Sequence, residues 1–322
     1  MQGGPTNTPE NALGAGINEQ QVLEAVRKSG YPLQTIIASS LQTDFRVQEE
    51  WSFVDNDSGA LRTLDIWASR RTFDLRNEDQ PFVRPTLDLL IECKQSDLPY
   101  VFFVSATQPQ LREFPYFAGL AQDRIEIKTD DDRSTYMETI LGALSLSDHP
   151  FVRDAAEPCM TFSKCVRKGD KIELSGTEAF QNTVLPLMKA LRYFKKQEQP
   201  PTTARYFDCH IPLAIAVIDA PMIAARIQNN VTSLSLTPWV RIVRYEAVDS
   251  APFYDRIQTF GIDVVHKSFF DNYLQQHAIP FAQQITPLAI KHHVELSTGK
   301  GFASGMGACD WRGIESRLRP AE

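Results

Sequence analysis

The sequence predicts an α/β fold in which a mixed central sheet is flanked by helices and carries insertions. Short apolar or alternating runs bounded by turn residues recur along the chain, and segments of helical periodicity separate some of them. Residues 211–218 form a nearly continuous apolar run, which is typical of a strand covered on both faces. Because a helical segment precedes that run, the pattern predicts a crossover connection to a parallel strand.

Composition places the chain among soluble globular proteins. It has 322 residues, 43% hydrophobic and 23% charged, and no apolar run approaches the ~18 residues that a membrane span requires. The five cysteines are scattered and odd in number, and no signal-peptide pattern opens the chain. We therefore expect free thiols in a reducing cytoplasm. The net charge of -7 argues mildly against binding of nucleic acid over the whole surface but allows a local basic groove.

The first part of the chain predicts a tail and two helices. Residues 1–15 are rich in Gly, Pro, Asn and Thr and are expected to form a disordered tail before one domain over residues 16–295. A helix is expected from Asn18, which can cap its N-terminus. Pro32 separates this helix from a second one, expected over residues 33–41.

Four strands are expected next. The first is expected over residues 47–53, where Val47, Glu49, Trp51 and Phe53 alternate with Gln48, Glu50 and Ser52. Residues 55–59 are typical of a turn, and a second strand follows over residues 61–68. A third strand over residues 87–94 and a fourth over residues 100–105 are expected to complete a meander.

The rest of the chain is expected to elaborate and close this core. Residues 106–169 are mixed in character and predict an insertion. Helical periodicity returns over residues 177–197, where Pro186 should kink or divide the helix. The glycines of residues 296–322 predict a loop-rich C-terminal tail. Two further strands are expected over residues 239–245 and 260–265.

Polar groups at the end of the third strand form the main candidate site. In an extended strand Glu92 and Lys94 point the same way, roughly 6.6 Å apart, while Cys93 points into the opposite face. A carboxylate and an amine that close an apolar strand are costly unless they are solvated or serve chemistry. With Asp65 on a neighbouring strand, they form the constellation that a metal-dependent phosphodiesterase needs.

Ordinary structural roles compete with this hypothesis. An acidic residue two positions before a basic one occurs by chance several times in a chain with 40 acidic and 33 basic residues. One competing pair, Glu126 and Lys128, lies in a highly charged segment and is explained by a solvated edge strand. A surface ion pair would also explain Glu92 and Lys94.

Other chemistries are weaker. A zinc site would combine Cys159 and Cys165 with Cys209 and His210, but the six-residue step between the first two is unusual. Residues 297–301 lack the spacing of a phosphate-binding loop, and no Ser or Thr follows their lysine. A nucleotide-hydrolysing motor is therefore not expected.

The order of these motifs resembles the PD-(D/E)xK phosphodiesterase superfamily, whose restriction-endonuclease-like fold has an α-β-β-β-α-β core. The likeness covers most of the chain, from about residue 18 to residue 285. The residues that carry it are Gly30-Tyr31-Pro32-Leu33, Gln48-Glu49-Glu50-Trp51, Arg62-Thr63-Leu64-Asp65-Ile66, Ile91-Glu92-Cys93-Lys94 and Leu185-Pro186-Leu187-Met188-Lys189-Ala190. The resemblance implies a restriction-endonuclease-like core, with insertions, and a nuclease site.

The resemblance also assigns roles to the site residues. Asp65 and Glu92 would hold Mg²⁺, or Mn²⁺ as a substitute, together with the backbone carbonyl of Cys93 and several waters. The ion would polarise the scissile phosphate and acidify a bound water. Lys94 would orient that water and offset charge on the phosphorane.

One position departs from the superfamily pattern. Many members add a glutamate from the first helical region, where this chain has Gln34, which can coordinate through oxygen but brings no charge. Metal affinity would then be weakened, unless Gln34 is a plain helix-surface residue. Glu24, Glu49 or Glu50 would be the alternative sources of the carboxylate.

Basic side chains are expected to contact nucleic acid. Lys189, Arg192 and Lys196 lie at helical spacing on one face, and Arg70 and Arg71 form a further cluster. A solvated helix face is the alternative explanation for the stripe.

The predicted function is a Mg-dependent nuclease that hydrolyses phosphodiester bonds, with DNA as the expected target. A role in microbial defence or DNA repair follows from analogy with such folds. One alternative is an inactive module that binds nucleic acid or a partner protein. Another is a nuclease subunit that a partner activates, as a homo-oligomer or as part of a defence complex.

Overall fold

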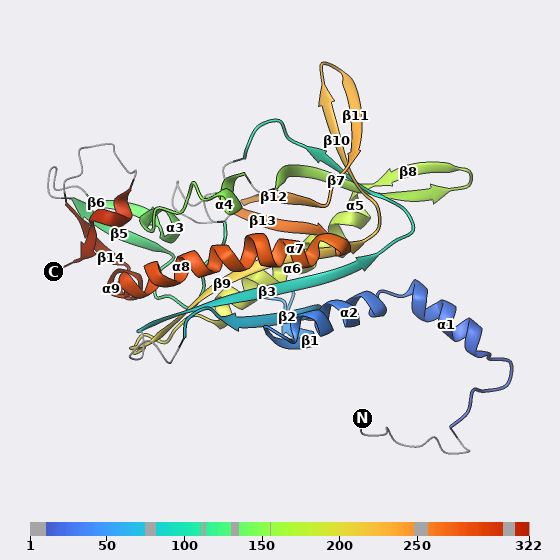
Figure 1. Cartoon of the computed structure of the whole chain (residues 1–322), viewed down its shortest axis with the longest axis horizontal. Coiled ribbons are helices and arrows are strands. Elements are labelled where there is room, and N and C mark those ends of the chain that lie inside the picture. The colour runs from blue at the N-terminus through green and yellow to red at the C-terminus, as the bar shows by residue number, and fades with distance from the viewer. Residues whose placement is uncertain are drawn as a thin grey trace.

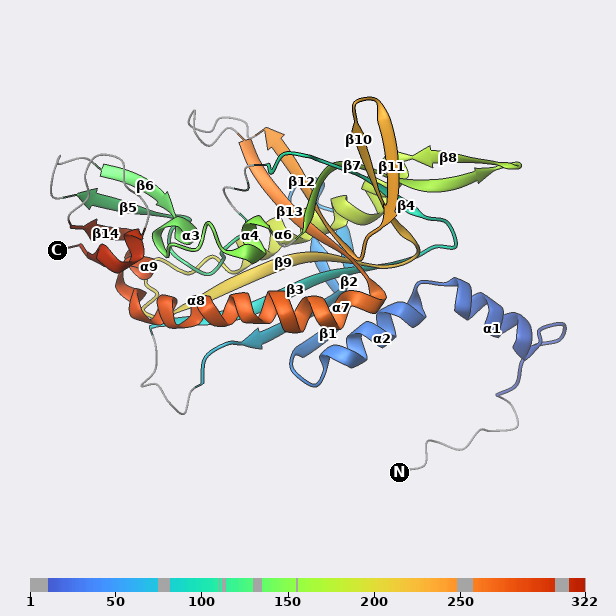
Figure 2. The same ribbon diagram turned by 45° about the horizontal axis from the view of Figure 1, so that its top comes forward.

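The computed structural model describes residues 11–74, 82–109, 111, 114–129, 135–154, 156–247, 257–304 and 313–321. Residues 1–10 of the expected disordered tail and residues 305–312 and 322 of the C-terminal tail lie outside this part. A large sheet runs through the molecule, a smaller sheet lies at one end, and helices cover the large sheet (Figures 1 and 2). The predicted α/β fold with a mixed sheet flanked by helices is confirmed.

Two helices open the described chain, as predicted. The first, α1 (Glu19–Lys28), begins at Asn18, whose side chain accepts a hydrogen bond from the Gln21 amide at 2.9 Å. Helix α1 buries none of its residues and projects from the body of the protein (Figure 2). The second, α2 (Tyr31–Leu41), packs its apolar side chains against the first three strands.

These three strands form the expected antiparallel meander. They are β1 (Arg46–Val54), β2 (Leu61–Arg71) and β3 (Val83–Gln95). The other edge of β3 pairs in parallel with β9 (Phe207–Asp219) along its whole length. The predicted crossover to a buried parallel strand is therefore confirmed.

The sheet continues beyond β9 in the order β13, β12, β7, β4, β10 and β11, with β8 paired to β7. These strands are β13 (Ile257–His266), β12 (Trp239–Ala247), β7 (Glu157–Lys168), β4 (Tyr100–Val104), β10 (Met222–Gln228), β11 (Val231–Leu236) and β8 (Lys171–Ser175). The pairs β9–β13, β12–β7 and β4–β10 are parallel, which makes the sheet mixed.

Two expectations about this region are corrected. The strand at residues 100–105 does not complete the meander, because β4 pairs with β7 and β10. The free edge of β3 is occupied by β9, whose side chains need cover on both faces. The segment 106–169 is also more than an insertion, since β7 is a strand of the large sheet.

The smaller sheet has the order β15, β14, β5, β6. Its strands are β15 (Leu318–Pro320), β14 (Lys300–Ala303), β5 (Arg124–Thr129) and β6 (Thr135–Thr139). The C-terminal region, expected to be loop-rich, contributes two of these strands and, with α9 (His293–Thr298), a short helix. Glu126 and Lys128 lie on β5, which has a partner on each side, so the expected edge strand is an interior one.

Helices enclose the large sheet from both faces. Helix α6 (Leu185–Gln197) packs on β3 and β9 from one side, while α7 (Phe270–Tyr273) and α8 (Ile279–Lys291) lie on the other (Figure 1). A short α5 (Gly176–Ala179) and a π-helical turn, Phe180–Val184, precede α6. Pro186 lies in the first turn of α6, so it divides the helical region as predicted.

A buried ion pair ties the middle of the sheet to its helical cover. Arg241 on β12 donates to Asp263 on β13 at 2.7 and 3.0 Å. The same guanidinium donates hydrogen bonds to the main-chain carbonyl oxygens of Phe151 and Val152, which belong to the short helix α4 (Pro150–Arg153). Further donors to the Asp263 carboxylate come from the Trp239 indole and the Tyr273 hydroxyl. Every oxygen of this buried carboxylate is therefore hydrogen-bonded.

Candidate metal and catalytic site

The three predicted catalytic residues lie together at one end of the meander. Ile66 pairs with Ile91, so Asp65 and Glu92 occupy the next position along the two antiparallel strands β2 and β3. Asp65 Oδ2 accepts a hydrogen bond from the main-chain N–H of Cys93 at 2.6 Å. Lys94 Nζ lies 2.5 Å from Glu92 Oε1. The structure thus brings Asp65, Glu92 and Lys94 to a common place around the end of β3.

Glu92 is the most buried member of this group, with 6% of its surface exposed. One carboxylate oxygen contacts Lys94, whereas the other, Oε2, is buried and has no hydrogen-bond partner among the described residues. Burial raises the pKa of Glu92 to about 7, against the opposing effect of the Lys94 ammonium and with a contribution from the Asp65 carboxylate. A buried acceptor without a donor is costly, so a cation bound to this oxygen would offset its desolvation.

Asp65 and Cys93 complete the inner part of the site. Burial raises the pKa of Asp65, while the Cys93 N–H and the Lys94 ammonium oppose this shift. Burial likewise raises the pKa of the Cys93 thiol, which lies in the apolar cluster beneath the sheet. Cys93 can therefore serve the site only through its main chain, the role that was predicted for it.

Helix α2 delivers Gln34 to the same place. The Gln34 side-chain amide donates to Glu50 Oε1 at 2.9 Å and to the main-chain oxygen of Asp65 at 3.1 Å. Gln34 is buried, so it is not a plain helix-surface residue. Among the three glutamates considered from the sequence, Glu50 is the one that contacts this group. The pairs on either side of it, Glu49 with Ile66 and Trp51 with Leu64, place Glu50 level with Asp65.

The backbone at Glu50 is irregular. Its φ of 51° lies in the left-handed region, which costs a non-glycine residue about 1 kcal/mol or more. Val47 packs with the apolar cluster on the α8 side, whereas Trp51, four positions later, packs with the cluster on the α6 side. A regular strand would keep both on one face. The irregularity therefore reorients β1 at the residue that faces Asp65.

The donors that the site offers a divalent metal are oxygens of the Asp65 and Glu92 carboxylates. Within the described ranges, no group of three or more His, Cys, Asp or Glu side chains is arranged to hold a metal ion. A hard cation that keeps most of its waters needs only one or two carboxylates. Asp65 and the unpartnered Glu92 Oε2 supply such oxygens, and the exposed Glu50 marks the side open to solvent. The residues present therefore fit Mg²⁺ or Mn²⁺.

The zinc alternative is not supported in the part of the chain that the structure describes. Cys159, Cys165 and Cys209 lie in three different apolar clusters, so they do not meet around an ion. Burial raises the pKa of each thiol, which disfavours the thiolate that zinc requires.

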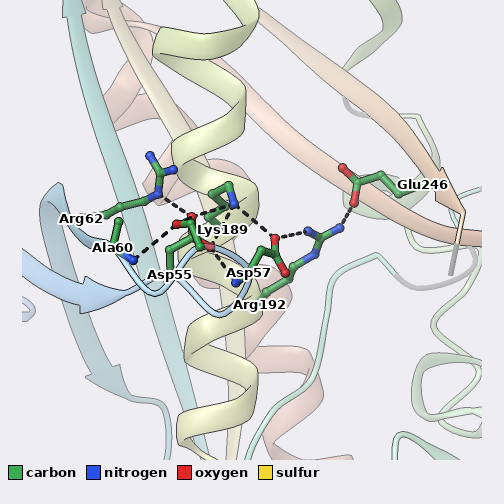
Figure 3. Close-up of polar contacts among 8 residues, drawn as sticks. Asp55, Asp57, Ala60, Arg62, Lys189, Arg192 and Glu246 are labelled. Carbon is green, nitrogen blue, oxygen red and sulfur yellow. Dashed lines mark hydrogen bonds and ion pairs between the residues drawn. The ribbon is translucent and has the colours of Figure 1, made fainter. Parts of the chain in front are cut away.

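Most of the predicted basic contacts have other partners. Lys189 on α6 reaches the β1–β2 turn, where its Nζ lies 2.7 Å from Asp55 Oδ2 and 3.2 Å from Asp57 Oδ2 (Figure 3). Arg192 contacts Asp57 at 3.5 Å and also pairs with Glu246. The Lys189 side chain is only 12% exposed and its charge is paired with two carboxylates, so this residue anchors the turn and does not present its charge to a nucleic acid.

The cluster at Arg70 and Arg71 lies away from the candidate site. These residues are at the opposite end of β2 from Asp65, at least about 15 Å away at 3.3 Å per residue. Arg70 stacks over the Phe45 ring and approaches Asp44 at 3.9 Å. Lys196 is exposed, with one contact among the described residues, to Asn56 Oδ1 at 3.5 Å. Of the predicted contacts, Lys196 and Arg71 are the exposed ones.

We expect Asp55→Ala to lower the free energy of unfolding by about 3 kcal/mol, because it removes the buried, closest counter-charge of Lys189 and leaves only the largely exposed Asp57 beside it. Burial opposes ionisation of Asp55, but hydrogen bonds from Lys189 and Arg62 hold its pKa well below its usual value. Urea unfolding measures the change. Asp57→Ala, which removes a largely exposed carboxylate from the same turn, is the control and should have a much smaller effect. Equal losses in the two variants would contradict the expectation.

The raised pKa of Glu92 predicts a pH-dependent stability. Between pH 4.5 and about 7 the folded chain keeps a proton on Glu92 that the unfolded chain has released. The free energy of unfolding should therefore fall as pH rises through this interval, by up to about 1.4 kcal/mol per pH unit. Urea unfolding in EDTA at pH 5 and pH 8 measures this, and Glu92→Gln should reduce the difference. The same pH dependence in both proteins would rule out Glu92 as its source.

None of the helices in the described part of the chain is long and apolar enough to cross a membrane. No family model, curated protein or solved structure matches the chain.

Proposed function

We propose that the chain is a metal-dependent nuclease with a restriction-endonuclease-like core, which hydrolyses phosphodiester bonds of DNA in the cytoplasm. The observation that carries this proposal is the group at the end of β3. There Asp65 is bonded to the Cys93 N–H, Glu92 keeps one unpartnered buried oxygen, and Lys94 lies against its other oxygen. A role in microbial defence or DNA repair belongs to the same proposal and rests on analogy.

The connectivity around the site supports the proposed core. In chain order, α2 is followed by the antiparallel strands β1, β2 and β3, then by α6 and the parallel strand β9. This is an α-β-β-β-α-β succession in which β4 to β8 lie between β3 and α6 in the chain, and β4, β7 and β8 extend the same large sheet. The three proposed catalytic side chains lie on its second and third strands, as the resemblance implies.

The residues of the site have complementary roles in this proposal. Asp65 and Glu92 would hold Mg²⁺ or Mn²⁺, with a contribution from the main chain of Cys93. When bound, such an ion supplies Lewis-acid activation of the scissile phosphate and of a water nucleophile. Lys94 orients the attacking water and stabilises negative charge that develops on the phosphorus oxygens. Glu92 carries the negative charge that would hold the ion at pH values above its pKa of about 7.

The direct test is cleavage of plasmid and linear DNA by the purified chain with Mg²⁺, with Mn²⁺ and with EDTA. The proposal expects cleavage with either ion and none with EDTA. Calorimetric titration with Mn²⁺ should show binding to the wild-type protein and loss of binding with Asp65→Asn. Metal-independent cleavage, or uptake of Mn²⁺ unaffected by that substitution, would refute the proposed site.

One observation favours a second candidate, a module that binds nucleic acid or a partner protein without cutting it. The Gln34 amide bridges Glu50 and the Asp65 main chain, so an uncharged group occupies the place of a third carboxylate. A pure binding module need not take up Mn²⁺. A subunit that a partner activates would bind the metal but leave DNA intact, so titration and cleavage together separate the three candidates.

A further inference from the structure

A cavity of about 400 Å³ lies outside the candidate site, beside the second half of α6. Its walls come from that helix, from the loop that precedes β5, and from the start of β13. The lining residues include Ala118, Gly119, Asp123, Arg192, Lys195 and Lys196. A volume of several hundred Å³ suits a small molecule or one unit of a polymer.

The charge of this cavity is predominantly positive. Arg192, Lys195 and Lys196 contribute three cations, and Asp123 contributes the one carboxylate of the lining. Lys195 lies 2.8 Å from Asp123, which offsets one positive charge. Arg192 is offset by Asp57 and Glu246, outside the lining. Lys196 has no acidic partner among the contacts of the described residues, so its ammonium is available to a ligand.

The opposite wall is a loop held in a fixed conformation. Ala118 exchanges two main-chain hydrogen bonds with His210, at 3.0 and 3.1 Å. Gly119 has a φ of 81°, and a Cβ there would lie 1.8 Å from the Asp208 carbonyl oxygen, so only glycine fits. His210 itself is held between Asp88 at 2.7 Å and Glu198 at 3.4 Å. The wall is therefore set before a ligand arrives, which lowers the entropic cost of binding.

We propose that this cavity binds a phosphate group, with Lys196 as the principal cation and Arg192 and Lys195 as its neighbours. The cavity is larger than a phosphate group, and three glutamine side chains line it, so there is room for an attached nucleoside. The ligand is thus a nucleotide unit that carries a phosphate, either at the end of a strand or as a free nucleotide. This site is separate from the β3 carboxylates, so the proposal holds whether or not the chain cuts DNA.

The test measures fluorescence anisotropy of a short single-stranded oligonucleotide labelled at its 3′ end. The probe is used with a 5′ phosphate and with a 5′ hydroxyl, and adenosine monophosphate and inorganic phosphate serve as competitors. EDTA in the buffer keeps the result independent of cleavage. We expect Lys196→Glu to weaken binding of the phosphate-bearing probe, or of the competitor, at least about tenfold by removing a charge-assisted contact. Lys196→Gln should give a smaller loss in the same direction.

Lys171→Glu is the matched control, because it reverses an exposed charge on β8, which does not line the cavity. A preference for the 5′ phosphate over the 5′ hydroxyl would support the site and identify a strand end as the ligand. Competition by adenosine monophosphate without that preference would support the site with a free nucleotide. Binding that ignores both the 5′ phosphate and the competitors would overturn the proposal. Equal losses with Lys196→Glu and Lys171→Glu would also overturn it, since they would indicate nonspecific attraction.

Discussion

Glu92→Gln is expected to lower the rate of Mg²⁺-dependent DNA cleavage by about 10³-fold. The substitution keeps the size of the side chain but removes the negative charge that would hold the ion, and loss of one preorganised electrostatic group typically costs a factor of 10² to 10³. Calorimetry should show that Mn²⁺ uptake is weakened in parallel, because Glu92 Oε2 is the unpartnered oxygen of the site. The rate is measured in single-turnover cleavage at saturating DNA.

Lys94→Ala should separate binding from chemistry. It leaves both carboxylates in place, so Mn²⁺ uptake should persist while cleavage falls by about 10²-fold through loss of charge stabilisation. The chain supplies its own control in Glu126 and Lys128, which repeat the acid-x-base pattern on β5 of the smaller sheet. Glu126→Gln should cleave at the wild-type rate. Full activity of Glu92→Gln and Lys94→Ala, or equal loss in the Glu126 control, would exclude the β3 site.

The largest expected loss of stability comes from Asp263→Ala, at about 4 kcal/mol in the free energy of unfolding. Both Arg241 and Asp263 are almost fully buried, with 2% and 1% of their surface exposed. Removing the carboxylate leaves the guanidinium without its counter-charge and the Trp239 and Tyr273 donors without their acceptor. Breaking one partner of a buried ion pair typically costs about 3 to 5 kcal/mol.

Urea unfolding measures this effect, with Asp219→Ala as the matched control. Asp219 lies on the neighbouring strand β9 and pairs with Lys267 at 2.7 Å in a partly exposed position, so its loss should cost less than about 1 kcal/mol. The double variant Arg241→Met/Asp263→Leu should recover part of the stability, because it removes both charges from the interior. If Asp263→Ala were as stable as Asp219→Ala, the Arg241 guanidinium would have found another partner or water, which would contradict the expected loss.

The elements predicted best from the sequence are those whose own pattern of apolar and polar side chains indicates how they are buried. The apolar run at 211–218 indicated a strand covered on both faces, and β9 is central in the sheet. The run at 100–105 indicated a strand but not its neighbours, because an apolar strand is compatible with many partners. Its pairing with β7 and β10 depends on chain segments far away in sequence. The strands of the C-terminal region were missed because they are only four and three residues long and the segment around them contains several glycines.

The candidate site shows the same division. The grouping of Asp65, Glu92 and Lys94 could be predicted from local spacing and strand alternation, because the three residues lie on two adjacent antiparallel strands. Glu50 was not separable from Glu24 and Glu49, because its position depends on the β1–β2 register and on a left-handed backbone. The role of Lys189 was hidden in another way. Its partner Asp55 lies 134 residues away in the chain, and helical spacing alone describes an exposed basic stripe equally well.

The continuous pairing of β3 with β9 has a consequence for how the active centre would meet its substrate. All 13 residues of β3 have a partner on β9, and most are buried. Amide hydrogens in such a ladder exchange with solvent mainly when the whole domain opens. In native-state hydrogen exchange, the backbone amides of the strand that bears Glu92 should therefore exchange among the slowest in the protein. They should exchange much more slowly than the amides of the exposed stretch around Glu50. A catalytic site on so rigid a strand would change its shape little, so the bound DNA would have to bend to fit it.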